Sequence, residues 1–244
     1  MPLKSKCALV TGGARRIGRE IGLSLARSGA DVAFTYSKSQ EEADQTVEEI
    51  GKLGVRSFSV RCDIREPAAV RSLSQEVVSH FGRLDLLVNN AGAYVTQSFE
   101  EISPGAWDDM FAVNVRGAFL MTQACAPELR RRKGRVVNIG SLGGIRPWAT
   151  HIQYCASKAA LHMLTQACAK ALAPEVTVNC VAPGMIDQGE GGTNPEFMER
   201  MARNTPMQRN GSAADVAQAV LFFATCPDFI TGEILTVDGG LSLA

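Results

Sequence analysis

Three residues in the second half of the chain have the types and spacing needed for proton transfer at a carbonyl oxygen. Tyr154 and Lys158 lie four residues apart in "YCASK", at the start of a helical stretch that runs to Leu172, so both side chains emerge on one helix face. A free phenol has a pKa of about 10, and an ammonium one turn away stabilises the phenolate. Lys158 is therefore expected to lower the pKa of Tyr154 and make it a general acid. Ser141, at the end of an apolar run, is expected to hydrogen-bond the same oxygen and fix it for hydride attack.

A glycine-rich stretch near the start of the chain, "TGGARRIG" at residues 11–18, separates a strand-like run from a helical one. In an α/β sheet, the turn after the first strand receives phosphates on the amides of a helix N-terminus. The glycines permit a tight turn with close backbone approach, although an arginine stands at position 16 where a glycine is expected. The candidate cofactor contacts in this stretch are Gly12, Gly13, Arg15, Arg16, Ile17 and Gly18.

The charges around this stretch favour NADPH over NADH. Positive charge at a helix N-terminus opposes the macrodipole, so a bound anion explains Arg15 and Arg16 better than solvated helix-start residues do. At the end of the second strand, an acidic residue would bind an unphosphorylated ribose. The chain has Tyr36, Ser37 and Lys38 there, and hydroxyls and cations favour a 2′-phosphate.

Other strand ends supply further candidate contacts to the cofactor. In "CDI" at 62–64, Asp63 is expected either to accept a hydrogen bond from an adenine amino group or to cap a helix, and the sequence does not choose between them. "NNAG" at 89–92 has small and amide residues that can lie against a flat nucleotide or simply form a turn. Lys158 is also expected to hold the nicotinamide ribose hydroxyls. The remaining candidates are Ile64, Asn90, Ala91, Gly92, Pro183, Gly184 and Ile186.

Strand-like and helical runs alternate from one end of the chain to the other. Most of the strand-like runs are continuously apolar, as strands covered on both faces require. The sequence thus predicts an α/β fold, a doubly wound seven-stranded parallel sheet of the Rossmann type, in a single domain over residues 1–244. The irregular segment 185–211 is predicted to be a lid over the site. The expected strands are residues 7–12, 31–36, 56–63, 84–92, 135–141, 176–184 and 233–240.

Composition excludes several classes of function. The 25 basic residues balance 25 acidic ones, so no overall field favours nucleic acid or a membrane surface. We see no signal-peptide pattern and no apolar run near the ~20 residues of a membrane helix, so a cytoplasmic location is expected. The seven cysteines are scattered singly and the three histidines have no ligand spacing, so no metal is expected.

Together these motifs resemble the short-chain dehydrogenase/reductase family over the whole chain. The residues 11–18, "NNAG", Asn114 in "NV", Ser141, "YCASK", "PG" at 183–184 and "TGEILTVDGG" follow the family's order. The resemblance implies a homotetramer and a role for Asn114 in a water-linked proton relay to Lys158. An arginine at position 16 is typical of members that use NADPH, which implies NADPH/NADP as the cofactor. Gln188 replaces a threonine common in the family.

The resemblance leaves the substrate open between a small molecule and an acyl thioester. The layout is similar to 3-oxoacyl-acyl-carrier-protein reductases, and the basic run 130–133 would either meet an acidic carrier or merely favour a helix C-terminus. "LAPEVTVN" and "GIRPW" are similar to pteridine-reductase-like members, although Ser141 suits a ketone better than a ring imine. The expected pocket walls are Trp148, Thr150, His151, Met185 and Phe197.

A third alternative, from a different class, is a nucleotide-binding regulator that retains the fold without turnover. The presence of all four family catalytic residues argues against it. These residues are Asn114, Ser141, Tyr154 and Lys158.

Overall fold

A computed structural model of the chain describes residues 1–187, 189 and 194–244. Its centre is a seven-stranded sheet in the order β3-β2-β1-β4-β5-β6-β7, with every neighbouring pair parallel. The predicted fold class is confirmed. The strands are β1 (Cys7–Val10), β2 (Asp31–Tyr36), β3 (Ser57–Arg61), β4 (Leu86–Asn89), β5 (Arg135–Ile139), β6 (Thr177–Pro183) and β7 (Ile234–Val237).

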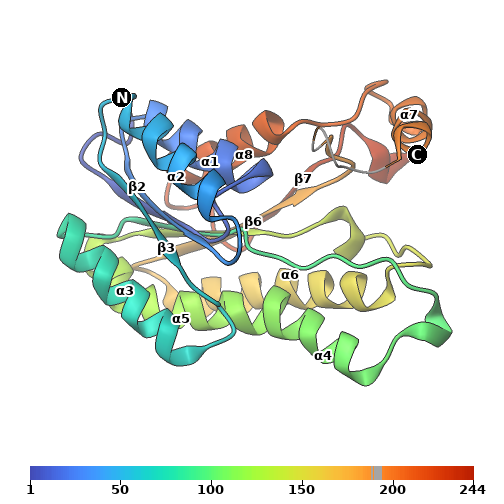
Figure 1. The fold of residues 1–244 in the computed structure, drawn as a ribbon, viewed down its shortest axis with the longest axis horizontal. Helices are drawn as coiled ribbons and strands as arrows, with labels where there is room; N and C mark the ends of the chain where they lie inside the picture. Colours follow the sequence, from blue (N-terminus) through green and yellow to red (C-terminus); the bar gives the residue numbers. More distant parts are fainter. Residues whose placement is uncertain (188, 190–193) are drawn as a thin grey trace.

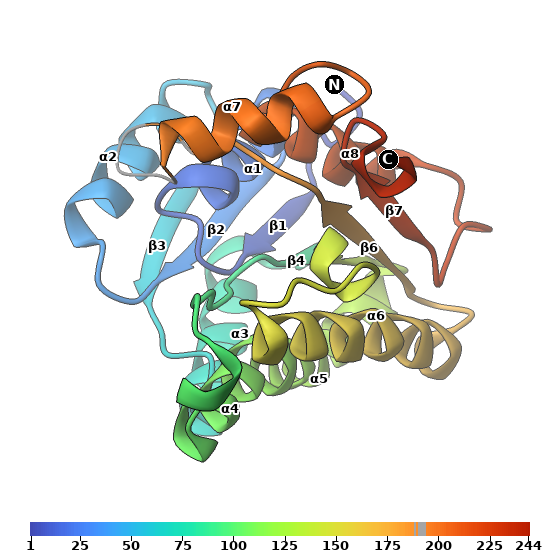
Figure 2. The same ribbon diagram turned by 90° about the vertical axis from the view of Figure 1, so that its right-hand side faces the viewer.

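Helices cover both faces of this sheet (Figure 1). On one face lie α1 (Arg16–Arg27), α2 (Gln40–Gly51) and α8 (Ala213–Thr225). On the other face lie α3 (Pro67–Phe81), α5 (Ala118–Arg132) and α6 (Ile152–Leu172). Two further helices, α4 (Pro104–Phe111) and α7 (Pro195–Asn204), lie toward one end of the molecule (Figure 2).

Two hydrophobic cores, one on each face, explain the continuous apolar strands. Successive strand side chains point to opposite faces. In β1, Ala8 and Val10 pack into the core under α1 and α8, while Cys7 and Leu9 pack into the core under α3 and α5. A polar residue at any of these positions would therefore lie in one core or the other.

The strand order reverses between β1 and β4. The strands β2 and β4 lie on either side of β1, and both pair with its carboxyl-end residue Val10. Such a switch point leaves a crevice beyond the carboxyl ends of the two strands, where α/β sheets bind their ligands. The predicted phosphate turn after β1 and the "NNAG" segment after β4 both lie there. The fold thus brings two segments about 80 residues apart in sequence to one place.

Segment 185–211 is more regular than the sequence suggested. Asn194 caps α7 through its side chain and Pro195 takes the first helical position, which suits a proline because its missing N–H needs no partner. At the base of the segment, Ile186 forms a parallel bridge with Gly211. Closure of this segment over a substrate stays a prediction, and Gln188 lies outside the described residues.

None of the helices that the structure describes is both long and apolar enough to cross a membrane.

Candidate active site

Ser141 and Tyr154 come together at the carboxyl end of β5. Ser141 lies two residues after the last residue of the strand and caps the short helix η3 (Leu142–Gly144), its hydroxyl accepting a hydrogen bond from the Gly143 amide at 3.0 Å. Tyr154 and Lys158 lie in the first two turns of α6, which packs against η3. A side chain at Gly143 would lie 3.3 Å from the Tyr154 ring and 3.4 Å from the Ser141 hydroxyl, so both side chains border that glycine. The two hydroxyls thus lie close together, and their predicted action on one carbonyl oxygen stays a prediction.

Burial is the largest cause of the pKa shifts of Tyr154 and Lys158. Desolvation raises the pKa of Tyr154 to about 12, and the Ser141 hydroxyl opposes this shift through a hydrogen bond. Desolvation also lowers the pKa of Lys158 to about 8. The Lys158 amine donates to the Ile139 carbonyl at 2.8 Å and lies 5.8 Å from the centroid of the Tyr154 ring. The predicted lowering of the phenol pKa by Lys158 is therefore wrong for this geometry. Tyr154 is protonated at neutral pH, the form that can donate a proton.

Asn114 holds two segments of the site together. It lies in η2 (Ala112–Gly117), one turn of π-helix between α4 and α5. Its amide donates to the Ala93 carbonyl at 3.0 Å and the Ser157 hydroxyl at 2.9 Å, and its oxygen accepts from the Ala93 amide at 2.7 Å. Gly92 lies between Asn114 and Lys158, because a side chain there would be 3.3 Å from the Asn114 oxygen and 3.6 Å from the Lys158 nitrogen. The water relay expected of Asn114 stays a prediction.

The turn after β1 needs its glycines for space as well as for conformation. Gly12 has a φ of +66°. A side chain at Gly13 would lie 2.5 Å from Phe34, and one at Gly18 would lie 2.2 Å from the Gly12 carbonyl. Arg16 has a φ of +54°, the left-handed region that favours glycine. The missing glycine is thus replaced by an arginine in a glycine conformation.

The N-terminus of α1 is suited to an anion. Arg15 occupies the cap position without a side-chain hydrogen bond to the helix, and the first turn has no acidic residue. Both Arg15 and Arg16 are exposed. Uncapped amides and adjacent cations are the groups that bind phosphate at helix N-termini.

The "NNAG" segment is hydrogen-bonded to the turn after β1. The Asn90 side chain donates to the carbonyls of Thr11 at 2.9 Å and Gly12 at 3.0 Å, and the Ala91 amide donates to the Thr11 hydroxyl at 2.9 Å. The amide side chain that was expected beside a nucleotide is thus used to hold the turn. A contact of this segment with a nucleotide stays a prediction.

The candidate cofactor contacts at the ends of β2 and β3 differ in whether their side chains are free to contact a ligand. Ser37 and Lys38 are exposed, whereas Tyr36 is buried with its hydroxyl bonded to Gln40. Asp63 pairs with Arg65 at 2.7 Å, and this guanidinium lowers the pKa of the carboxyl.

The cap of α3 is Glu66, so the prediction that Asp63 caps a helix is wrong. The side chains of Ile64 and Ile186 are buried in the two cores, and the partly buried Ile17 packs against one of them. Contact of these isoleucines with a cofactor stays a prediction. Gly184 lies where a side chain would be 2.6 Å from Asp238, directly after Pro183 at the end of β6.

Two residues that the sequence patterns did not predict border the candidate catalytic residues. His162 lies one turn beyond Lys158 on α6, and its Nε2 accepts a hydrogen bond from the Ser141 amide at 3.4 Å. Burial lowers the pKa of His162 to about 4, and the nearby Lys158 lowers it further in the same direction. The imidazole is therefore neutral at pH 7 and can accept this bond. Its spacing of four from Lys158 was the signal in the sequence.

Tyr94 is the second missed residue. It follows "NNAG" by two positions, and its ring centroid lies 5.0 Å from that of Tyr154 in an edge-to-face arrangement. Of the predicted pocket walls, His151 and Trp148 lie beside it, with ring centroids 5.6 Å apart. Phe197 lies on α7 and packs against Arg200.

Comparison with known proteins agrees with this geometry. A family profile described as Enoyl-(Acyl carrier protein) reductase matches residues 12–242. A 3-oxoacyl-(acyl-carrier-protein) reductase of Staphylococcus aureus is 39% identical over 241 residues, covering 97% of this chain and 98% of the relative. Two solved structures were determined with bound dinucleotides. One, a short-chain dehydrogenase of Burkholderia cenocepacia in complex with NADP, has a TM-score of 0.94 at 39% identity and covers 99% of this chain and 100% of that one.

The other is a blue fluorescent protein from a metagenomic library in complex with NADPH, with a TM-score of 0.93 at 34% identity, covering 99% of this chain and 100% of that one. A short-chain dehydrogenase/reductase of Serratia marcescens has a TM-score of 0.94 at 37% identity, and the match covers 99% of this chain and 100% of that one. Similarity therefore extends over the crevice, the catalytic helix and segment 185–211.

Proposed function

The chain belongs to the short-chain dehydrogenase/reductase family, and we propose that it reduces a ketone with NADPH as the hydride donor. The observation that carries the proposal is the convergence of Ser141 and Tyr154 on Gly143, beside the switch point of the sheet. Solved relatives in complex with NADP and NADPH support the choice of cofactor.

The protein's own groups hold and protonate the carbonyl oxygen. The Ser141 hydroxyl, fixed at its position by the Gly143 and His162 contacts, donates a hydrogen bond to this oxygen. Tyr154, protonated at neutral pH, gives its proton to the same oxygen as the alcohol forms. Lys158, held by the Ile139 carbonyl beside Gly92, orients the ribose that carries the nicotinamide. When bound, NADPH supplies the hydride that reaches the carbonyl carbon.

The crevice has the residues that a phosphorylated dinucleotide needs. Glycines at positions 12, 13 and 18 let the turn pack closely against Phe34 and Asn90. The N-terminus of α1 then presents uncapped amides where a pyrophosphate can bind. Three exposed cations lie close to the carboxyl ends of β1 and β2, where a 2′-phosphate binds in folds of this type: Arg15, Arg16 and Lys38. We attribute the preference for NADPH over NADH to these cations.

A ketone fits the site better than the alternatives. Ser141 donates to a carbonyl oxygen, whereas a ring imine would gain more from an acid at that position. The relative that reduces a 3-oxoacyl-(acyl-carrier-protein) makes an acyl thioester the second candidate substrate. The basic run favours a carrier only weakly, because Arg131 and Arg132 pair with Glu128 and Arg130 donates to the Ala171 carbonyl.

We also propose that the enzyme is a homotetramer, as membership of the family implies. Helices α5 and α6 lie side by side on one face (Figure 1), and each exposes a large apolar side chain, Phe119 and Met163. A second exposed apolar group follows in α8 and β7, with Phe222 and Leu235. Light scattering should give a molar mass four times that of the chain, and a monomer would contradict this.

Turnover tests the proposed function. The protein is mixed with NADPH and, separately, a simple ketone, an acetoacetyl thioester and a dihydropteridine, while the absorbance of the reduced cofactor is followed. We expect oxidation of NADPH with the ketone. Tight binding of NADPH without turnover of any substrate would instead favour a regulator that retains only the fold. Turnover of the dihydropteridine alone would favour reduction of a C=N bond.

A further inference from the structure

A wall of aromatic side chains stands beside the catalytic tyrosine. The ring of Tyr94 stacks on that of His151, with centroids 4.7 Å apart and an angle of 28° between the planes. The edge of the same ring meets Tyr154 at 5.0 Å, and Trp148 meets His151 edge-on at 5.6 Å. These rings come from the loop after β4 and the loop before α6. They form a continuous surface that leads away from the phenol, which we call the aromatic wall (Tyr94, Trp148 and His151).

Hydrogen bonds fix the wall in place. One nitrogen of the His151 ring bonds with the Thr96 hydroxyl at 2.9 Å and the other with the Thr150 hydroxyl at 2.8 Å. The Gln97 amide donates to the Thr150 carbonyl at 3.0 Å, which ties the two loops together. A ring whose two nitrogens are both bonded keeps one orientation, so Tyr94 stacks on a surface that does not need to be ordered when a ligand arrives.

Much of the wall is free to meet a ligand. Tyr94 is 56% exposed although it touches the catalytic residue, and burial of the remainder raises its pKa. Its ring lies against His151 and Tyr154, and more than half of its surface remains open to a ligand. Flat rings bind to such surfaces by stacking, which adds to the free energy from buried area alone.

The wall continues into a cavity of suitable size. Beyond Trp148 lies a pocket of about 490 Å³ whose walls also include Leu142, the neighbour of Ser141, and Met201 of α7. Ligand sites for small molecules have volumes of roughly 300–1,000 Å³. Arg146 also lines this pocket, and its guanidinium donates to the carbonyls of Leu241 and Ser242 at 3.0 Å each. Its guanidinium is thus engaged by backbone, and the surface offered to a ligand is mainly apolar and aromatic.

We propose that the substrate is a ketone with an aromatic ring attached to the carbonyl carbon, and that this ring stacks on the aromatic wall. The inference rests on the proposed function, because the carbonyl is placed at Ser141 and Tyr154. The ring then lies along Tyr94 and Trp148, and larger substituents extend into the pocket beyond Leu142. Recognition is through the flat face of the ring, so a saturated ring of the same size binds less well.

A pair of matched ketones tests the proposal. Acetophenone and cyclohexyl methyl ketone have the same carbon skeleton and differ in the planarity of the ring. With NADPH in excess, we expect kcat/KM of the wild-type enzyme to be about tenfold higher for the aryl ketone, a difference that single stacked contacts can produce. Tyr94→Leu and Trp148→Leu should each lower kcat/KM for acetophenone several-fold more than for the cyclohexyl ketone, so the ratio of the two values should fall.

Phe229→Leu is the matched control, because Phe229 is an aromatic residue that is 98% exposed and precedes β7, at the amino end of the sheet, whereas Ser141 follows the carboxyl end of β5. It should leave the ratio of the two kcat/KM values unchanged. Equal kcat/KM for both ketones in the wild type, or an unchanged ratio in both wall variants, would overturn the aromatic-wall proposal and leave the proposed function standing. Absence of turnover with both ketones and with an acetoacetyl thioester would overturn both.

Discussion

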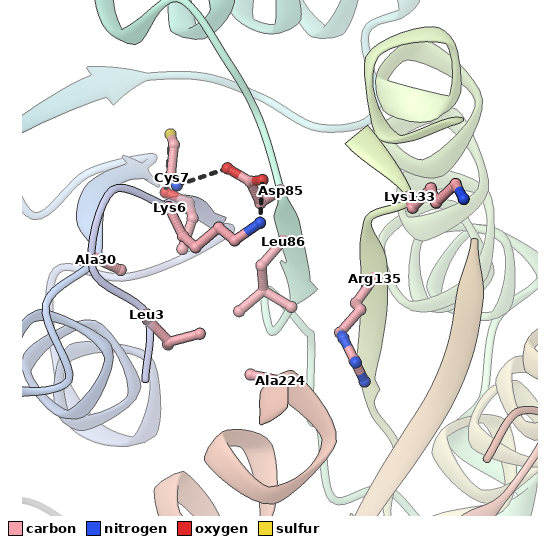
Figure 3. Close-up of a pocket in the computed structure, with 10 residues that line it drawn as sticks. Leu3, Lys6, Cys7, Ala30, Asp85, Leu86, Lys133, Arg135 and Ala224 are labelled. Atoms are coloured by element: carbon pink, nitrogen blue, oxygen red, sulfur yellow. Dashed lines mark hydrogen bonds and ion pairs between the residues drawn. The ribbon is translucent and has the colours of Figure 1, made fainter. Parts of the chain in front are cut away.

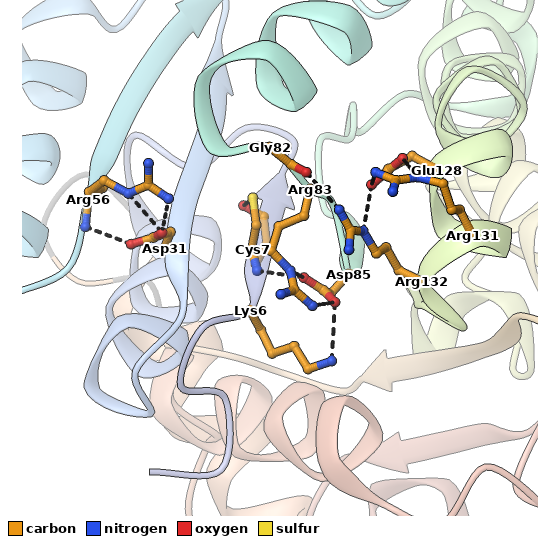
Figure 4. Close-up of polar contacts among 11 residues, drawn as sticks. Lys6, Cys7, Asp31, Arg56, Gly82, Arg83, Asp85, Glu128, Arg131 and Arg132 are labelled. Atoms are coloured by element: carbon orange, nitrogen blue, oxygen red, sulfur yellow. Dashed lines mark hydrogen bonds and ion pairs between the residues drawn. The ribbon is translucent and has the colours of Figure 1, made fainter.

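The two ends of the parallel sheet differ in how their charged side chains are paired. Before the strands begin, Arg56 pairs with Asp31 at 2.6 Å and Arg83 pairs with Asp85 at 2.6 Å (Figure 4). Where the strands end, Arg15 and Arg16 are exposed and take part in no ion pair with any residue of the described ranges. Asp31 and Asp85 at the amino ends are thus neutralised within the fold, whereas Arg15 and Arg16 beyond β1 have no carboxylate partner among the described residues, which suits the proposed binding of an anion.

The same contrast holds for buried groups. At the amino ends, burial alone would raise the pKa of Asp85, but hydrogen bonds from Arg83 and the Cys7 amide lower it. At the carboxyl ends, burial shifts Tyr154 and Lys158 toward their neutral forms, and the hydrogen bond from Ser141 to Tyr154 offsets only part of the shift. A small cavity of about 50 Å³ at the amino ends is bordered by Lys6 and Asp85 of the ion-pair cluster (Figure 3). pKa values that burial moves away from their usual range are typical of residues that do chemistry.

The largest expected effect is on catalysis at the carboxyl end. Tyr154→Phe should lower kcat for ketone reduction about a thousandfold, because it removes the proton donor. The dissociation constant for NADPH, measured by fluorescence titration, should stay within about twofold of the wild-type value. Retention of full kcat would show that another group protonates the substrate.

The next effect is on stability at the amino end. Asp85→Asn should lower the free energy of unfolding by about 3 kcal/mol in urea, because it leaves Arg83 and Lys6 beside a buried site without their carboxylate. Activity per folded molecule should not change. Lys52→Gln, which breaks an exposed pair with Glu48, is the control and should have no measurable effect. Equal stability of the Asp85 variant and the control would refute the role given to the amino-end pairs.

The pH dependence of this effect has a defined sign. The pKa of Asp85 is lower in the folded protein than in the unfolded chain, so its contribution is present above an unfolded value of about 3.9. The contribution is lost as the pH falls through the folded value. The stability difference between wild type and Asp85→Asn should therefore shrink in acid. A difference that stays constant down to the folded pKa would contradict the assignment.

At the carboxyl end, removal of the buried charge of Lys158 should raise the free energy of unfolding, the opposite of the effect expected for Asp85→Asn. The pKa of Lys158 is about 8 in the folded protein against 10.5 for a free lysine, so burial of its charge costs stability at neutral pH. Lys158→Met should therefore raise the free energy of unfolding by about 2 kcal/mol while activity is lost. The cost is full below about pH 8 and disappears as the pH rises through the unfolded value, so the two proteins should converge in base. A less stable variant would contradict this.

The smallest expected effect concerns the arginine in a glycine conformation. Arg16→Gly relieves a left-handed φ and should raise the free energy of unfolding by up to about 1 kcal/mol. The ratio of the dissociation constants for NADH and NADPH should fall about tenfold, because a cation near the 2′-phosphate is lost. Arg19→Gln, in the same helix but paired with Glu49, is the control. An unchanged ratio in Arg16→Gly would remove this residue from cofactor selection.

Sequence patterns predicted the sheet well because the central strands are buried on both faces. The run predicted over 31–36 coincides with β2, and the run over 7–12 contains β1 (Cys7–Val10), which ends before the glycine turn. Spacing also placed Tyr154 and Lys158 on the same helix. The helix α7 was missed because glycines and polar residues obscured it, although Asn194 and Pro195 are a recognisable start.

The electrostatics of the site were not predictable in the same way. A spacing of four residues shows that two side chains share a face, but it does not show how deeply they are buried. Burial turned the expected lowering of the Tyr154 pKa into an increase. Tyr94 was missed for a related reason, since its contact with Tyr154 joins a loop to a helix 60 residues further along the chain and depends on the tertiary fold.

Transfer of isotope in a single turnover tests the central claim most directly. The enzyme is mixed with an equimolar amount of NADPH that carries deuterium at the transferred position, and with an excess of an aryl ketone in ordinary water. We predict deuterium on the carbinol carbon of the product, hydrogen on its oxygen, and a rate about a thousandfold slower in Tyr154→Phe. Deuterium on the carbon at the wild-type rate in Tyr154→Phe, or none on the carbon in the wild type, would contradict the account.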